Sequence, residues 1–155
     1  MKRQYYLLFI TCFFLFNSCN KNITKKDSKR ETEEELIENA LKIHKKDLTL
    51  NTHAATPLRM IDPRFDMSAW HDPNETGSKV DYPRRKEGDV DAIFFAAFVA
   101  QDIRNDDGNS RAKSLCFQMI DSILVSIERN SDIVGLALNP QDAYSLEKED
   151  KRAIY

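Results

Sequence analysis

The chain has 155 residues, a length typical of one domain, and it carries 23 Lys and Arg against 25 Asp and Glu, for a formal net charge of −2. That balance argues against a strongly basic nucleic-acid-binding protein, because neutralising phosphates needs a local excess of Lys and Arg, and we expect no nucleic-acid partner. A hydrophobic share of 41% is enough for a buried core, whereas 3 cysteines exclude a disulfide-stapled mini-fold.

The first 18 residues have the pattern of a signal peptide. A basic start is followed by an uncharged run, residues 5–16, which suits a signal-peptide core and is shorter than the about 20 apolar residues that span a membrane. The run leads to Ser18-Cys19, which resembles the lipobox of bacterial lipoproteins, where the cysteine is lipidated and becomes the new N-terminus. We therefore predict a signal peptide at 1–18, lipidation of Cys19, and a lipid-anchored protein of the bacterial cell envelope that faces the periplasm or the surface. An ordinary secretory signal with an incidental cysteine is the alternative.

A polar tether and the first elements of a folded body follow the predicted anchor. Residues 19–35 are polar and charged without apolar periodicity, which predicts a tether. Helical spacing of apolar residues predicts a helix over 32–46, and residues 47–53 have the pattern of a short strand that ends at His53. Residues 54–82 contain several prolines and little periodicity, so we expect a long ordered loop of the kind that is usually functional in a compact domain.

The second half of the chain alternates between predicted strands and helices. A short helix is expected over 83–87, and residues 90–100 (VDAIFFAAFVA) form an apolar run typical of a strand buried on both faces. The pattern then predicts an amphipathic helix over 110–129, a short connection, a helix over 139–149 and a further strand over 152–155.

This order of elements indicates an α/β fold with a parallel sheet. About two and a half strand–helix units cannot close an eight-stranded barrel, which takes about 250 residues. We therefore interpret residues 36–155 as the N-terminal part of a larger fold.

His53 is the candidate metal ligand. In parallel α/β folds, ligands and metals are held at the carboxyl ends of strands, where His53 is predicted to lie. The alternative is a histidine hydrogen-bonded in a core or loop, since the sequence places no second ligand nearby. His44 and His71 are interpreted as structural or solvated, and no catalytic residue is assigned, because no HExxH, Ser-His-Asp or Cys-His spacing occurs.

Three stretches carry a resemblance to a known family. Residues 40–57 (ALKIHKKDLTLNTHAATP) resemble the start of the membrane (renal-type) dipeptidase family, where a helix and an apolar strand lead into a sequence like D-T-H-x-D-T-P. Residues 80–99 (VDYPRRKEGDVDAIFFAAFV) are similar to the family's D-x-P-R-x-x-E-G-G-V-x-A-x-F-F-A-x-F-V stretch. Residues 139–155 resemble the segment before its third strand. The resemblance extends over residues 36–155.

The resemblance implies a TIM-like (β/α)8 barrel, here truncated after about two and a half strand–helix units. It also implies a zinc metallopeptidase that hydrolyses dipeptides with two zinc ions at the carboxyl ends of the strands. Of the family's ligands, only His53 carries over. The motif's Asp is Ala55 here, Asn51 replaces the Asp before Thr-His, and Asp89 replaces the second Gly of Glu-Gly-Gly-Val. The bridging Glu and the later histidines would lie beyond Tyr155.

Two functions remain open from the sequence. The first is a zinc metallo-dipeptidase by family resemblance, with a dipeptide as the substrate of intact relatives, whose present chain is truncated, inactive and without bound zinc. The second is a non-enzymatic envelope lipoprotein that acts as an interaction module. We favour the first, because nothing else in the sequence indicates a binding surface.

Overall fold

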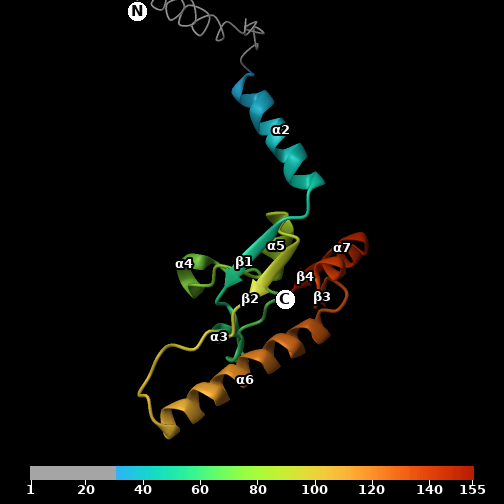
Figure 1. The fold of residues 1–155 in the computed structure, drawn as a ribbon. Helices are drawn as coiled ribbons and strands as arrows, with labels where there is room; N and C mark the ends of the chain where they lie inside the picture. The colour runs from blue at the N-terminus through green and yellow to red at the C-terminus, as the bar shows by residue number, and fades with distance from the viewer. Residues whose placement is uncertain (1–30) are drawn as a thin grey trace, which may run out of the picture. The chain divides into compact units, whose positions relative to one another are not determined.

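The computed structural model describes residues 31–155, so the predicted signal peptide, Cys19 and most of the predicted tether lie outside the described residues. The chain divides into two units, residues 1–36 and 37–155, and the second holds the sheet. The elements in chain order are α2 (Glu33–Lys46), β1 (Leu50–Ala54), α3 (Pro57–Met60), α4 (Pro73–Thr76), α5 (Tyr82–Glu87), β2 (Ala92–Phe95), α6 (Asp106–Arg129), β3 (Val134–Leu136), α7 (Pro140–Lys148) and β4 (Arg152–Ile154) (Figure 1).

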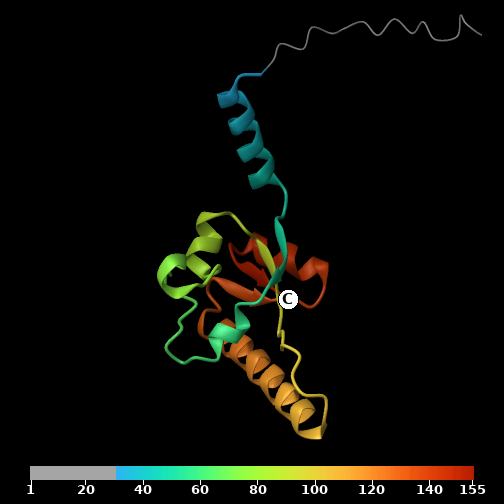
Figure 2. The same ribbon diagram turned by 90° about the vertical axis from the view of Figure 1, so that its left-hand side faces the viewer.

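The four strands form one parallel sheet in the order β1-β2-β4-β3. Because side chains alternate along a strand, the sheet has two different faces. Ile93 of β2 and Ile154 of β4 belong to the larger core, with residues of α5 and α6. Their neighbours Ala92 and Ala153 belong to a smaller core with α7. Figure 2 shows α7 on the side of the sheet opposite to α4 and α5, with α6 below.

The helix ends show why the predicted helices begin where they do. Thr32 and Glu35 cap α2 reciprocally: the Glu35 N–H donates to Thr32 Oγ1 at 3.2 Å and the Thr32 N–H donates to Glu35 Oε2 at 2.8 Å. Asn139 and Asp142 form the same capping box at α7, with Pro140 in its first turn. The predicted helices over 32–46, 110–129 and 139–149 are confirmed to within a few residues.

The apolar run over residues 90–100 is strand for only part of its length, so the prediction of a long strand buried on both faces is wrong. The strand comprises Ala92–Phe95, and residues 96–105 follow as irregular backbone. Phe94 is 42% exposed because its face of the sheet is covered by α7 near β3 and β4 alone. It stacks on Tyr155, with ring centroids 4.6 Å apart.

β3 was predicted as a connection, and that prediction is also wrong. Three residues with a glycine at the centre carry no readable period-2 pattern. The structure shows why Gly135 stands there: a Cβ atom would lie 2.3 Å from Leu146 Cδ2, so its absence lets α7 pack on the strand. The predicted loop over 54–82 contains the two short helices α3 and α4 and is otherwise turns and irregular backbone.

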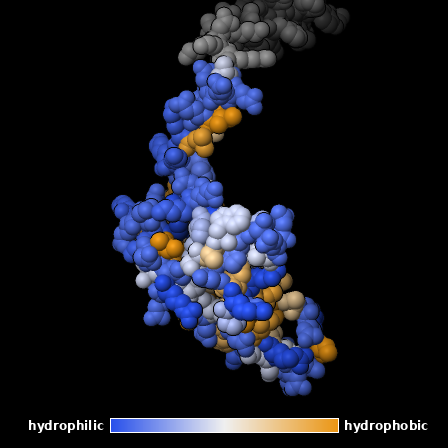
Figure 3. Space-filling view, turned by 180° about the vertical axis from the view of Figure 1, so that it is seen from behind, coloured by the Kyte–Doolittle hydropathy of each residue, from blue (hydrophilic) through white to orange (hydrophobic). Residues whose placement is uncertain are grey.

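Within residues 31–155, none of the helices combines the length and the apolar character needed to cross a membrane. Apolar side chains do reach the surface. Seen from behind, they gather on the lower part of the body, in the region of α6 (Figure 3). The exposed apolar residues of α6 are Phe117, Ile120, Leu124 and Val125.

Candidate metal centre

The carboxyl ends of the four parallel strands meet at one edge of the sheet. His53 lies there, as the penultimate residue of β1. The pairing of β1 with β2 is irregular between Asn51 and Ala54, where one extra residue is inserted on the β1 side. Ala54 is buried in the larger core, whereas the four residues of β1 before it, His53 included, are exposed.

His53 is exposed, and its backbone makes a local hydrogen bond. Its backbone N–H donates to Asn51 Oδ1 at 2.9 Å, so the residue that replaces the family's aspartate caps the strand end. The imidazole has no hydrogen-bond partner in residues 31–155. Its ring nitrogens are therefore available to bind a metal ion.

The two other histidines are tied to the protein backbone. His44 Nε2 lies 3.1 Å from the Gly88 carbonyl oxygen. His71 Nε2 lies 2.7 Å from the Asp66 carbonyl oxygen, and its ring stacks on Phe65 with centroids 4.4 Å apart. Both histidines thus have the structural surroundings expected from the sequence.

Metal donors do not gather around His53. Among the residues within three positions of the four strands' carboxyl ends, His53 alone carries an imidazole, thiol or carboxylate. In the part of the chain that the structure describes, no group of three or more His, Cys, Asp or Glu side chains is placed to hold a metal ion. A catalytic zinc commonly needs three protein ligands and a structural zinc four, so these residues do not fit a zinc site by themselves.

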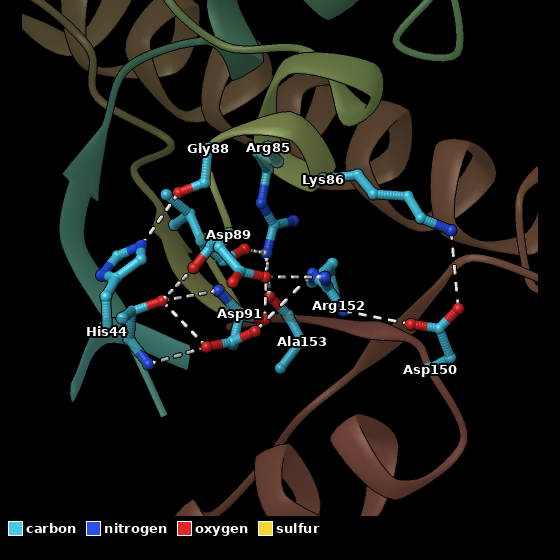
Figure 4. A network of polar contacts seen from close by, with 11 residues as sticks. His44, Arg85, Lys86, Gly88, Asp89, Asp91, Asp150, Arg152 and Ala153 are labelled. Carbon is cyan, nitrogen blue, oxygen red and sulfur yellow. Dashed lines mark hydrogen bonds and ion pairs between the residues drawn. The ribbon is translucent and has the colours of Figure 1, made fainter. Parts of the chain in front are cut away.

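Polar side chains gather instead at the opposite, amino edge of the sheet (Figure 4). Asp91, directly before β2, accepts a hydrogen bond from the Thr49 N–H at 2.9 Å, and its own N–H donates to Thr49 Oγ1 at 3.0 Å. Arg152, in β4, lies 3.7 Å from Asp91 and 3.5 Å from Asp89. This network was not predicted from the sequence; the signal for it was a polar or charged residue at or directly before the start of β1, β2 and β4.

Arg85 is the most buried member of this amino-edge network, at 4% exposure. Its Nη2 donates to the carbonyl oxygens of Ala153 at 3.0 Å, Asp91 at 3.2 Å and Val90 at 3.4 Å. These bonds link α5 to the beginnings of β2 and β4. The network joins the amino ends of the strands, whereas parallel α/β folds hold their reactive groups at the carboxyl ends. Its residues therefore fit a structural role better than a catalytic one.

The fold agrees with the comparisons to known proteins. The sequence profile of the membrane dipeptidase family (Peptidase family M19) matches residues 37–155, and the chain belongs to that family. No curated protein matches it.

A solved structure is similar in fold. The crystal structure of the probable dipeptidase PvdM from Pseudomonas aeruginosa superimposes with a TM-score of 0.68 at 16% sequence identity, over 79% of this chain and 30% of that one. The parallel α/β fold expected from the sequence is therefore confirmed as part of a dipeptidase fold. The present chain spans less than a third of that protein's length.

Proposed function

We propose that this chain supplies the first strands of a zinc-dependent dipeptidase barrel and a single metal donor, His53. The observation that carries the proposal is the place of His53 at the carboxyl end of β1, in a chain that belongs to the membrane dipeptidase family. Parallel α/β enzymes collect their reactive groups at that edge, because every strand directs its following loop there.

The residues present do not complete the site. Ala55 stands two positions after His53, directly after the end of β1, where the family motif has a carboxylate. A methyl group offers no lone pair to a cation. We therefore propose that the family's chemistry, zinc-assisted hydrolysis of dipeptides, needs donors that residues 31–155 do not supply, and that this chain alone is inactive.

Hydrolysis of dipeptides tests this proposal. The purified 155-residue chain, supplied with zinc, should release no amino acids from a panel of dipeptides above a protein-free blank. His53→Ala and His44→Ala should behave like the unaltered chain. Hydrolysis that is lost in His53→Ala and kept in His44→Ala would contradict the proposal, because it would show a working site around His53.

We also propose that Cys19 carries a lipid anchor, a proposal that rests on the sequence alone. Cys19→Ala should move the protein from the membrane fraction to the soluble fraction of the expressing cells, because one acylated terminus would supply the apolar contact with the bilayer. Quantitative immunoblotting of both fractions measures the shift, and Cys116→Ala is the matched control with its anchor intact. Unchanged membrane association of Cys19→Ala would contradict the proposal of a lipid anchor.

A further inference from the structure

The helix α2 carries an apolar stripe that the described part of the chain leaves exposed. No residue of α2 is buried. Ala40 is exposed, and the larger apolar residues before and after it on that side of the helix are 52–62% exposed. These are Leu36, Ile37, Leu41 and Ile43. In Figure 3, hydrophobic residues form a line along one side of α2. Such side chains gain free energy when they are buried against another apolar surface.

The charges of α2 are separated between its two ends. The first turn is acidic and the last turn is basic. Glu34 and Lys45, near opposite ends, make no ion pair within residues 31–155. Counted outwards from Ala40, the residues at equal distances are Glu38 and Lys42, Ile37 and Ile43, Glu35 and Lys45, and Glu34 and Lys46. The sequence of α2 is therefore symmetric about Ala40, with glutamate on one side wherever lysine stands on the other.

This symmetry makes α2 complementary to a second α2 that runs in the opposite direction. A two-fold axis at Ala40 exchanges the two halves of the stripe, so that Leu36 of one copy meets Ile43 of the other. Ala40 meets Ala40 at the centre, where small side chains let two helices approach to about 8 Å. Glu34 and Lys45 are separated by three helical turns, on the same side of the stripe. Each Glu34 therefore lies beside the Lys45 of the other copy.

The antiparallel direction also suits the connection from α2 to the sheet. α2 ends at Lys46 and β1 begins at Leu50, so the sheet follows the carboxyl end of each helix. In an antiparallel pair these two ends lie about 21 Å apart, whereas a parallel pair would bring both sheets and both sets of like charges together. A membrane surface is a poorer partner, because the acidic first turn is repelled by anionic lipid headgroups.

We propose that α2 is a dimerisation helix, which pairs in the antiparallel direction with α2 of a second copy of this chain. The stripe around Ala40 supplies the apolar contact, and the acidic and basic ends select the direction. The contact is small, so the dimer exchanges with the monomer.

Disulfide cross-linking of the full chain in expressing cells tests the proposal. In a Cys116→Ser chain, Ala40→Cys should form a disulfide-linked dimer on mild oxidation, because the two Cα atoms lie within the about 7 Å that a disulfide bridges. Glu33→Cys is the matched control. Its two copies would lie about 21 Å apart, and we expect about tenfold less dimer. The Cys116→Ser chain without an added cysteine gives the background from the other cysteines.

A variant of the stripe tests the apolar contact. Ile37→Lys, added to the chain with Ala40→Cys, places a charge in the contact and should lower the cross-linked fraction about tenfold. Leu58→Lys is the control, since Leu58 is an equally exposed leucine outside α2, and it should leave the fraction unchanged.

Exchange of the charges tests the direction independently of the stripe. In the chain with Ala40→Cys, Glu34→Lys and Lys45→Glu should each lower cross-linking, because like charges then face each other across the pair. When the two variants are co-expressed with different epitope tags, the mixed dimer should recover, because each position 34 again faces an opposite charge at position 45.

Any of four results would overturn the proposal. One is the absence of a dimer from Ala40→Cys above the background. Another is equal cross-linking of Glu33→Cys, which would show a parallel pair or random collisions. A third is an undiminished dimer in Ile37→Lys. The last is a mixed dimer of Glu34→Lys and Lys45→Glu that is no more abundant than either variant's own dimer. If Ile37→Lys does not accumulate in cells, the mixed dimer decides.

Discussion

Asp81→Ala should lower the free energy of unfolding by about 3–5 kcal/mol, the range for removing one partner of a buried, hydrogen-bonded ion pair. Asp81 has no solvent exposure. Its Oδ1 accepts from the Arg84 N–H at 2.8 Å, which caps α5. Its Oδ2 accepts from Arg84 Nε at 2.6 Å and from the His71 N–H at 3.0 Å. The substitution would leave these donors without an acceptor in a place that water does not reach.

Urea denaturation of the unaltered chain and the variant measures this loss. Asp62→Ala is the matched control: Asp62 also pairs with an arginine, Arg64 at 2.7 Å, but on the surface, where solvent screens the pair. We expect no measurable change from Asp62→Ala. A change from Asp81→Ala as small as that from Asp62→Ala would show that the buried carboxylate does not hold residues 71–84 together.

Ala55→Asp should raise the affinity of this chain for Zn²⁺ on the order of a hundredfold, because a second donor on the same strand converts one contact into a chelate. Position 55 follows the end of β1 two residues after His53, and both residues are exposed. Competition with a zinc-sensitive dye measures the dissociation constant.

Thr52→Asp is the control for Ala55→Asp. It adds the same charge beside His53 but does not reproduce the His-x-Asp spacing of the family motif, so we expect little gain. The double variant His53→Ala, Ala55→Asp should lose the gain. A gain as large in Thr52→Asp would show that general electrostatic attraction, and not a chelate with His53, draws the cation.

Much of the fold could be predicted from the sequence, because the local patterns that favour a helix or a strand agree with how these segments pack. α6 has an apolar stripe, and α7 begins at an asparagine followed by a proline, so both were predictable from short stretches. The family could be predicted too, from the residues around His53 and those before β2. These features depend on residues that are close together in the chain.

The remaining features depend on residues far apart in the chain. Arg85 donates to the carbonyl oxygen of Ala153, 68 positions away. Neither segment contains a local sequence pattern that predicts this hydrogen bond. The exposure of Phe94 depends on which part of the sheet α7 covers. This is set by tertiary packing, so the apolar sequence of residues 90–100 does not predict it. β3 is stabilised by pairing with β4 and by the packing of Leu146 on Gly135, and its three residues carry no pattern of their own.

The zinc content of the purified chain tests the central claim most directly. Metal analysis after dialysis against a slight excess of Zn²⁺ should find well below one zinc per chain, since one imidazole with an alanine in the carboxylate position does not make a site. The same analysis of His53→Ala should give an equal value. Zinc near one per chain, lost in His53→Ala, would contradict the account, because it would mean that other donors converge on His53 and complete a site within this chain.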